Sequence, residues 1–441
     1  MTVHHVFGHE LRRLRTQQGV SLKALSEMTH YSKGYLSRVE TGARAATPEL
    51  AQRCDDVLGA GGALRARVAT TRLVAEPRVN DLRLGTGPFG RPAKDPTRPA
   101  QLPMAEPDFV GRAEALRQLD ALPAPHRVTV CAISGMAGTG KTALAVHWAH
   151  RARNRFPDGC LFAELSGPDG NPVPPVQVLG AFLGALLPGT PLPATLAERS
   201  ALFRTLLDGR RMLVVLDGAV GAEQVRPLLP AAPGCLVLVT SRQRLTGLTA
   251  AHPLPLPPLT PGEATELAAT VIGPTRTGLE PGAVRELVES CGLLPLAVRL
   301  AATQLAARPS WLVSSLTERL RQDDELLLRL GGGALAYAFR SGYQRLSRSA
   351  ADAFRRIAPL DGPLLAVSAA AVVLGRSRVE AEAVLEELVD ASLLDTPAPG
   401  LYRCHPLLGA FARTLAQRLE CGLLGAESSY ELAAPAVPVA L

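Results

Sequence analysis

The residues with the clearest chemical meaning lie at positions 135–142, which read Gly-Met-Ala-Gly-Thr-Gly-Lys-Thr. This is the G-x-x-x-x-G-K-[ST] spacing of a phosphate-binding loop. Glycines let backbone N–H groups point at phosphate oxygens, and a following helix N-terminus adds a favourable dipole. Lys141 is expected to reach the β- and γ-phosphates of a nucleotide, and the Thr142 hydroxyl to bind Mg²⁺. The pattern predicts ATP or ADP with Mg²⁺ as cofactors, and a phosphate site made by Gly135, Gly138, Thr139, Gly140, Lys141 and Thr142.

The flanking sequence is the setting that this loop requires. An apolar, β-branched stretch at 127–133 precedes it, and a helical pattern at 143–150 follows it. The alternative is a glycine-rich loop in front of an ordinary helix. Lysine otherwise occurs only at Lys23, Lys33 and Lys94, and every other basic residue is arginine. Because the planar guanidinium of arginine does not replace a compact ammonium, the retained lysine favours the phosphate-binding interpretation.

Two further groups of polar residues follow apolar strands. Asp217 ends the stretch 212–216, and Thr240-Ser241-Arg242 ends the stretch 235–239. A carboxylate after four apolar residues is typical of a Mg²⁺-binding aspartate, and an arginine after the next strand could report on the γ-phosphate. The alternative for Asp217 is a simple turn residue. We therefore predict Lys141, Asp217 and Arg242 as the catalytic set, with Thr142 and Asp217 holding Mg²⁺.

The residue after Asp217 is Gly218, which offers no carboxylate to orient an attacking water. Whether the chain is an enzyme thus stays open, and it is at most a slow P-loop ATPase that acts as a switch.

Strand and helix patterns must alternate to place these residues together. Strands are expected at 160–165, 212–216 and 235–239, with helices at 175–187 and 196–207 between them. Such alternation predicts a parallel sheet with helices on both faces, in which ligands bind at the carboxyl ends of the strands.

Length and composition indicate several globular domains, and the absence of membrane and signal-peptide patterns predicts a cytoplasmic location. A chain of 441 residues with 47% hydrophobic content suggests about three globular domains. No apolar run reaches the roughly 18–20 residues of a membrane span, and we expect the longest, 364–374, to be a core helix. The first ten residues lack the apolar stretch of a signal peptide. The scattered cysteines indicate reduced thiols, with no disulfide framework or zinc site.

The charge is concentrated near the start of the sequence. Residues 1–105 hold 16 Lys and Arg against 9 Asp and Glu, while the remainder holds 31 of each. A basic module on a neutral body is typical of nucleic-acid binding, although a solvated basic tail would have the same charge.

Residues 6–69 have the pattern of a bundle of short helices. Helices are expected at 8–18, 22–28 and 33–40, and a fourth begins with Thr47 as N-cap and Pro48 at its first position. The segment 20–42 resembles the Xre/Cro-type DNA-binding domain, in which the third helix enters the major groove. That resemblance assigns DNA contacts to Ser32, Lys33, Tyr35, Ser37 and Arg38. Glu40 is expected to pair with an arginine of the first helix, and a bundle that serves protein contacts is the alternative.

The body resembles the NB-ARC family, one of the signal-transduction ATPases with numerous domains. The resemblance rests on Phe109-Val-Gly-Arg112, the phosphate loop, Asp217, residues 240–242 and the run 291–297, Cys-Gly-Leu-Leu-Pro-Leu-Ala. Plant disease-resistance proteins, apoptosome scaffolds and many bacterial transcriptional regulators contain this unit. The resemblance implies that Val110 and Arg112 lie near the adenine and ribose, and that Pro295 packs on the adenine.

The family also implies a winged helix in the last third, with a histidine at the β-phosphate. Here the matching residues are Cys404-His405-Pro406. The resemblance makes His405 a nucleotide ligand, whereas a lone histidine is more often structural. Pro406 stands where the family has an aspartate, and it has neither charge nor N–H, which questions how firmly an ADP state is held.

The predicted fold is multidomain. It has an all-α helix-turn-helix head (1–70), a flexible basic linker (71–106), an α/β P-loop domain with a parallel sheet (107–257), a helical subdomain (258–330), a winged-helix subdomain (331–419) and a disordered tail (420–441).

The predicted function is an ADP/ATP-switched DNA-binding transcriptional regulator. Its expected partners are a double-stranded DNA operator and further copies of itself on activation, with no membrane and an unknown signalling partner. A turnover ATPase that acts on DNA or protein, and a scaffold with a structural nucleotide, are the alternatives.

Overall fold

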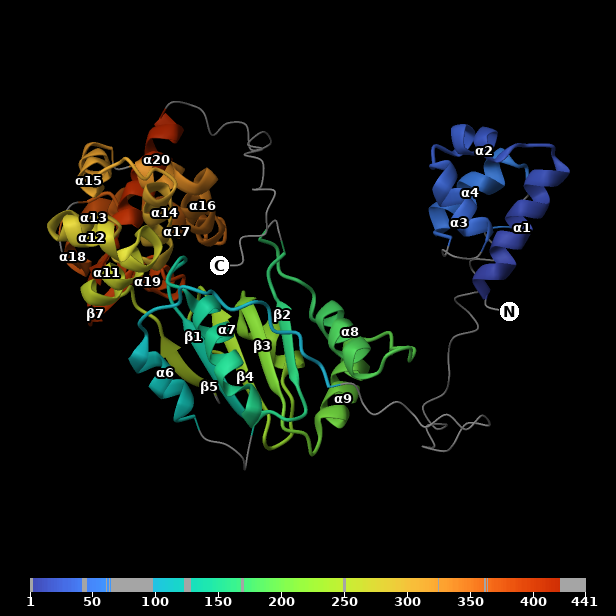
Figure 1. Cartoon of the computed structure of the whole chain (residues 1–441), viewed down its shortest axis with the longest axis horizontal. Helices are drawn as coiled ribbons and strands as arrows, with labels where there is room; N and C mark the ends of the chain where they lie inside the picture. The colour runs from blue at the N-terminus through green and yellow to red at the C-terminus, as the bar shows by residue number, and fades with distance from the viewer. Residues whose placement is uncertain are drawn as a thin grey trace. The chain divides into compact units, whose positions relative to one another are not determined.

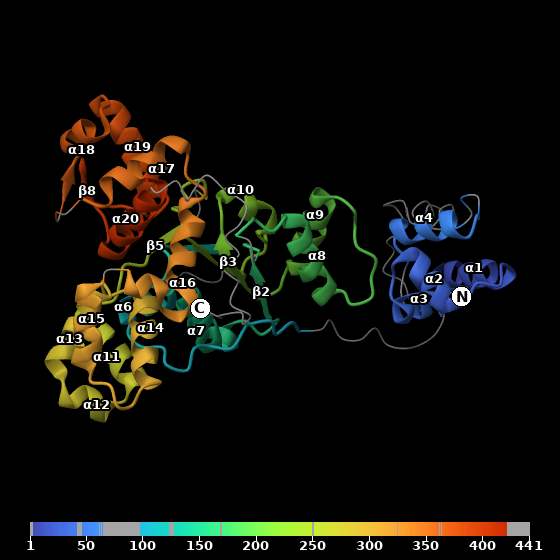
Figure 2. The same cartoon turned by 90° about the horizontal axis from the view of Figure 1, so that it is seen from above.

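The computed structural model describes residues 3–41, 46–60, 62, 64, 98–122, 128–167, 170–248, 251–323, 325–360, 362 and 364–420. These residues form two compact units, which divide between positions 92 and 93 (Figures 1 and 2). The predicted linker lies outside the described residues up to position 97, and the predicted tail lies outside them from position 421.

The first unit is helical. Its helices are α1 (Val3–Gln17), α2 (Leu22–Thr29), α3 (Lys33–Glu40) and α4 (Pro48–Val57). The side chains of Ser21, Ser32 and Thr47 each accept the backbone N–H three residues ahead, which satisfies a donor that the helix leaves unpaired. The core of this unit is made by Leu11, Leu25, Leu36, Val39 and Leu50. Met28, which the spacing places on the same face as Leu25, is 44% exposed instead.

An ion pair joins the first and third helices. The Arg15 guanidinium donates to Glu40 at 2.6 and 3.0 Å, and also to the carbonyl of Val20 at 2.9 Å. The expectation that Glu40 pairs with an arginine of the first helix is therefore confirmed. Because both side chains are largely buried, the pair fixes α3 against α1.

The second unit contains a five-stranded parallel sheet. Its strands are β1 (Thr129–Ser134), β2 (Cys160–Glu164), β3 (Leu213–Ala219), β4 (Leu236–Ser241) and β5 (Ala251–Pro255), in the order β2-β3-β4-β1-β5 (Figure 1). β1, β3 and β4 are almost continuously apolar because both faces of the sheet are covered.

Side chains alternate between two cores, one on each face. One face packs against α8 (Pro175–Leu186) and α9 (Leu196–Leu207) through residues such as Val214 and Phe182. The other packs against α6 (Ala113–Asp120) and α7 (Lys141–Ala152) through residues such as Val215 and Trp148. A parallel sheet covered on both faces, as the alternation predicts, is confirmed. Two short segments, α10 (Ala222–Val225) and the 3-10 turn Arg226–Leu228, follow β3.

β5 was not expected from the sequence. It contains Pro253 and Pro255, which lack the N–H that a strand donates to its neighbour, and both prolines and His252 are exposed. The sheet tolerates them because β5 lies at its edge and pairs only with β1.

A helical group follows the sheet and packs near its carboxyl edge. It comprises α11 (Pro261–Ile272), α12 (Pro274–Leu279), α13 (Pro281–Ser290), α14 (Pro295–Ala306), α15 (Val313–Gln322) and α16 (Leu326–Tyr343). Thr260 and Glu263 form the capping box that the sequence predicts at the start of α11. α16 is broken at 330–333, where three glycines have positive φ, and the predicted subdomain boundary falls at this break.

The last group contains α17 (Arg348–Ile357), α18 (Val367–Leu374), α19 (Arg378–Asp390), α20 (Pro406–Glu420) and a small antiparallel sheet. The sheet consists of β6 (Leu365–Ala366), β7 (Asp395–Ala398) and β8 (Leu401–Arg403), in the order β6-β8-β7. Figure 2 shows α16 between this group and the preceding helices, and the two groups share one continuous core.

The apolar run 364–374 differs from the expected core helix. Residues 365–366 form β6, and α18 buries Val367, Ala370 and Leu374 but leaves Val372 82% exposed. An alanine- and valine-rich run is apolar on every side, so its sequence alone does not reveal which side is covered. Among the described residues, no helix combines the length and apolar character that crossing a bilayer requires, and the described cysteines are free thiols.

Candidate nucleotide site

The glycine-rich loop joins β1 to α7 at the carboxyl edge of the sheet. Gly138 and Gly140 have φ of 85° and 84°, a region that favours glycine. A Cβ on Gly135 would lie 2.6 Å from the carbonyl oxygen of Leu256, so a side chain is excluded there as well. No side chain caps α7, which leaves its first backbone N–H groups available to an anion. The loop therefore has the geometry of a phosphate cradle.

Lys141 lies folded back over this loop. Its ammonium donates to the carbonyls of Gly135 and Met136, both at 2.8 Å, and only 8% of the residue is exposed. Burial, and next the positive charge of Arg242, lower the pKa of Lys141 to about 7, while Asp217 acts in the opposite direction. A bound polyphosphate would favour the charged ammonium, so this group is suited to an anionic ligand.

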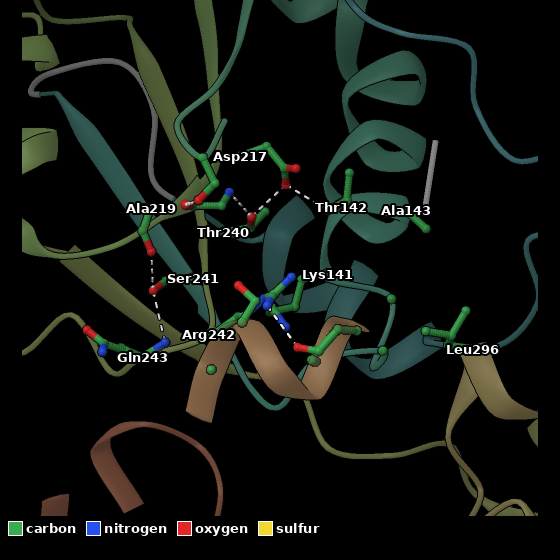
Figure 3. Close-up of a pocket in the computed structure, with 18 of the residues that line it drawn as sticks. Lys141, Thr142, Ala143, Asp217, Ala219, Thr240, Ser241, Arg242, Gln243 and Leu296 are labelled. Carbon is green, nitrogen blue, oxygen red and sulfur yellow. Dashed lines mark hydrogen bonds between the residues drawn. The ribbon is translucent and has the colours of Figure 1, made fainter. Parts of the chain in front are cut away.

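Asp217 connects the loop to the neighbouring strand. Its Oδ1 accepts the hydroxyls of Thr142 at 2.7 Å and Thr240 at 2.6 Å, while Thr240 accepts the backbone N–H of Gly218 at 2.9 Å (Figure 3). A hydroxyl and a carboxylate with few other protein ligands are what Mg²⁺ takes beside a phosphate, because it keeps several waters. The donor set of this site therefore fits Mg²⁺ bound together with a nucleotide, held by Thr142 and Asp217.

Arg242, at the end of β4, contacts the helical part of the same unit. Its guanidinium donates to the carbonyl of Ala338 in α16 at 2.9 Å. Burial, followed by the positive charge of Arg345, lowers the pKa of Arg242. The side chain expected at a γ-phosphate thus holds a helix from the C-terminal part of the chain.

A cavity of about 240 Å³ collects these side chains. Seven of the predicted site residues line it: Gly138, Gly140, Lys141, Thr142, Asp217, Arg242 and Pro295. Pro295 begins α14, and the next residue, Leu296, donates its N–H to the Gly138 carbonyl at 3.2 Å. The start of α14 therefore closes one side of the phosphate loop.

Four charged residues that line the cavity were missed by sequence reasoning: Glu106, Glu164, Arg299 and Arg345. Arg345 follows α16 and donates to the Gly170 carbonyl, and Arg299 pairs with Glu106 at 3.1 Å and Asp108 at 2.7 Å. Glu106 lies in an irregular segment ahead of α6, and the other three lie in or directly after an ordinary helix or strand, so only the tertiary fold brings them to the cavity. The end of β2 at Glu164 was the one available signal, because strand ends of a parallel sheet meet at one edge.

The structure does not bring five predicted nucleotide residues into the cavity lining. Gly135 and Thr139 belong to the loop, and Val110 packs against the helical core. Arg112, at φ 61°, donates to the carbonyls of Thr139 at 2.8 Å and Pro257 at 2.7 Å. Its guanidinium thus donates to backbone oxygens and braces the loop, and its position near the ribose stays a prediction.

His405 also lies outside the cavity lining. Its Nε2 is 2.9 Å from the carbonyl of Gly292, its Nδ1 accepts the N–H of Leu407 at 3.2 Å, and burial lowers its pKa. A Cβ on Gly292 would lie 2.4 Å from the ring. In this arrangement the histidine joins α20 to the segment before α14. Pro406 occupies the first position of α20, where a missing N–H costs nothing.

The predicted DNA contacts lie on α3 and at its start. Ser32, Lys33, Ser37 and Arg38 are exposed, and Tyr35 is half-buried and stacks on Tyr31 at 5.4 Å. Leu36 and Val39 face the core on the opposite side. The helix thus presents a polar face, and the DNA contacts of these five residues stay a prediction.

Comparisons with known proteins agree with both units. Residues 6–68 match the family model described as a helix-turn-helix domain. The chain is 45% identical over 344 residues to the regulatory protein AfsR of Streptomyces griseus, covering 75% of this chain and 35% of that protein. It is 44% identical over 359 residues to AfsR of Streptomyces coelicolor, covering 79% and 36%. The chain thus spans about a third of the length of these relatives.

A solved structure supports the fold of the body. The Walker-type ATPase of Pyrococcus abyssi superposes with a TM-score of 0.50 at 14% identity, covering 73% of this chain and 99% of that one. Together, the fold and the site define a body with a P-loop ATPase-like fold, and the sequence carries a helix-turn-helix domain ahead of it. These findings support the resemblance to NB-ARC-type regulators, with a helix-turn-helix domain at residues 6–68.

Proposed function

We propose that this chain is a DNA-binding transcriptional regulator whose state is set by ADP or ATP with Mg²⁺. The helix-turn-helix unit supplies the DNA contacts, and the nucleotide at the phosphate loop selects between two arrangements of the body. Self-association accompanies the ATP-bound arrangement. The proposal is supported by the helix-turn-helix match, by the regulatory relatives and by the cavity residues that fit a Mg²⁺-nucleotide.

The observation that carries the switch is the hydrogen bond from Arg242 to Ala338. A γ-phosphate is a stronger acceptor for a guanidinium than a neutral carbonyl, because the bond is charge-assisted on both sides. ATP would therefore compete with α16 for Arg242, whereas ADP would leave the contact in place. A ligand shifts an equilibrium only by its difference in affinity for the two states, and this contact provides such a difference.

Other hydrogen bonds hold the arrangement of the body seen in this structure, which we call the closed state. The N–H of Arg244 donates to the Asp390 carbonyl in α19 at 3.1 Å, Arg345 donates to Gly170, and His405 contacts Gly292. Each joins the helical or last group to the P-loop domain or to the segment before α14. We infer that they act together to favour the closed, ADP-bound state, even though Pro406 replaces the acidic residue of the family.

On the DNA side, Lys33 and Arg38 supply the charge at the exposed face of α3. Arginine and lysine pair with phosphates and with guanine edges, while Ser32, Ser37 and Tyr35 add neutral donors. A double-stranded operator is the partner that this chemistry fits. Replacing Arg38 with alanine is expected to weaken DNA binding without changing nucleotide binding.

The nucleotide retained by the purified chain tests this proposal. Gentle purification should yield a chain with ADP bound, and mass measurement should show a larger assembly after exchange into Mg-ATP than with ADP. A chain that takes up neither nucleotide would refute the nucleotide site. One that holds ADP without ever exchanging it would instead indicate a structural cofactor.

A further inference from the structure

The cavity holds a carboxylate that the nucleotide-binding motifs do not account for. We propose that Glu164 orients the water that attacks the γ-phosphate of bound ATP and accepts its proton, so that the chain hydrolyses ATP and resets itself to the ADP state. This proposal rests on the nucleotide site of the proposed function. It places the carboxylate that accepts the proton on β2, next to β3, which holds Asp217.

The register of the sheet places Glu164 beside Asp217. β2 and β3 are parallel neighbours, and the last residue of β2, Glu164, pairs with Asp217. Residues in register on adjacent strands point to the same face, and neighbouring strands lie about 4.8 Å apart. Both residues line the cavity together with Lys141 and Thr142. The carboxylate of Glu164 therefore lies one strand away from the Mg²⁺ ligand and on the same side of the sheet.

The position that follows Asp217 holds a glycine in a conformation that disfavours a side chain. Gly218 has φ of 72°, its N–H donates to Thr240, and its carbonyl accepts the hydroxyl of Ser166 at 2.7 Å. A Cβ there would have a strained backbone and would meet Ser166 Oγ at 3.4 Å. The backbone after Asp217 thus favours glycine, and in this chain a carboxylate that orients water would come from another strand.

Glu164 is the one acidic residue of the cavity lining without a partner. Asp217 accepts two hydroxyls, and Glu106 pairs with Arg299 at 3.1 Å. The side chain of Glu164 is exposed and makes no hydrogen bond or ion pair within the described part of the chain. An unpaired carboxylate can accept a hydrogen bond from water, as positioned glutamates do in general base catalysis.

The surrounding charges favour the same assignment. Lys141, Arg242 and Arg345 line the cavity and would neutralise the phosphate oxygens as charge develops on them. In the reaction, the water oxygen forms a bond to the γ-phosphorus and the bond to the β–γ bridging oxygen breaks. The electron pair of that bond leaves with ADP, and the water proton passes to Glu164 and then to solvent.

The test uses the full-length chain and the isosteric change Glu164→Gln. The matched control is Glu289→Gln, an exposed glutamate on α13 that does not line the cavity. Three readouts are taken with Mg-ATP: the affinity for a fluorescent ATP analogue, the identity of the nucleotide that stays bound after desalting, and the rate of phosphate release.

We expect Glu164→Gln to bind ATP with the wild-type affinity, to retain ATP where wild type retains ADP, and to release phosphate about 10²-fold or more slowly. The control should match wild type in all three readouts. Phosphate release by Glu164→Gln at the wild-type rate would overturn the assignment, as would a wild-type chain that binds ATP and never hydrolyses it. A wild-type chain that does not bind Mg-ATP would refute the proposed function itself, and this assignment with it.

Discussion

Replacing Arg242 with alanine should reduce the ability of the chain to distinguish ATP from ADP. The guanidinium is largely buried and donates one hydrogen bond to Ala338 at 2.9 Å in the closed arrangement. In the proposed ATP-bound arrangement it donates to the γ-phosphate instead. ADP has no γ-phosphate, so its affinity depends on Arg242 only through the stability of the closed body.

The size of the effect follows from the kind of bond. A hydrogen bond that involves a charged group contributes about 1.5–3 kcal/mol, which corresponds to roughly 10- to 150-fold in affinity. We therefore expect the affinity of Arg242→Ala for Mg-ATP to fall by that factor. The affinity for ADP should fall by less, because the variant loses only the hydrogen bond to the neutral carbonyl of Ala338 in the closed state and no contact with ADP itself.

The assay is a competition titration in which ATP and ADP displace a fluorescent ADP analogue. Arg244→Ala serves as the control, since the side chain of Arg244 is exposed and only its backbone N–H contacts α19. The control should keep the wild-type ratio of ATP to ADP affinity. An unchanged ratio in Arg242→Ala would show that this arginine does not sense the γ-phosphate.

Three further predictions concern other contacts. Burial holds the pKa of Lys141 at about 7 in the free chain; phosphate should raise it, so nucleotide binding at pH 8 should take up close to one proton, measured by titration calorimetry in buffers of different ionisation enthalpy. Equal heats in all buffers would contradict this. Arg15→Ala should destabilise the helix-turn-helix unit by about 3 kcal/mol, because it leaves the buried carboxylate of Glu40 without its arginine. The control Arg13→Ala, which removes an exposed arginine, should cost less than about 1 kcal/mol. Hydrogen exchange of the α1 and α3 amides distinguishes the two variants, and equal protection in both would refute the difference. Gly292→Ala should expose α20 to proteolysis, because residue 292 has φ of 58° and the new Cβ would lie 2.4 Å from the ring of His405. Gly282→Ala, which has open space around it, should leave the cleavage unchanged. Equal cleavage of the two variants would rule out this contact.

The nucleotide motifs could be predicted because their chemistry is local. The loop at 135–142 needs glycines, a lysine and a threonine at fixed spacing, and these residues are adjacent in the chain. Asp217 and Arg242 follow apolar strands, and the carboxyl ends of parallel strands meet at one edge. The Asp217–Thr142 contact follows from that rule, and the structure adds its partner Thr240.

The rest of the cavity depends on contacts that short patterns do not contain. Arg345 reaches the site because α16 contacts Arg242, just after β4, through Ala338, and Glu164 becomes relevant only through its register with Asp217. The family resemblance places Arg112 near the ribose, and nothing in the local sequence indicates that its guanidinium also donates to the carbonyls of Thr139 and Pro257. A buried donor takes whichever acceptor the fold brings near, and its sequence neighbours do not specify that acceptor.

The same reasoning explains the missed β5 and the misjudged run at 364–374. Edge strands tolerate prolines that a central strand excludes, so composition argues against a strand that the fold nonetheless forms. In a uniformly apolar run, no periodicity marks the buried side, and packing against α17 and α19 decides it.

DNA affinity measured as a function of the bound nucleotide tests the central claim most directly. A DNA site would be selected by the full-length chain from a random pool, and its dissociation constant measured with Mg-ATP, with ADP and without nucleotide, for wild type and Lys141→Ala. We predict that wild-type affinity for DNA differs between ATP and ADP, and that Lys141→Ala binds DNA with one affinity in all three conditions. A Lys141→Ala variant that still responds to ATP, or a wild-type chain indifferent to both nucleotides, would contradict it.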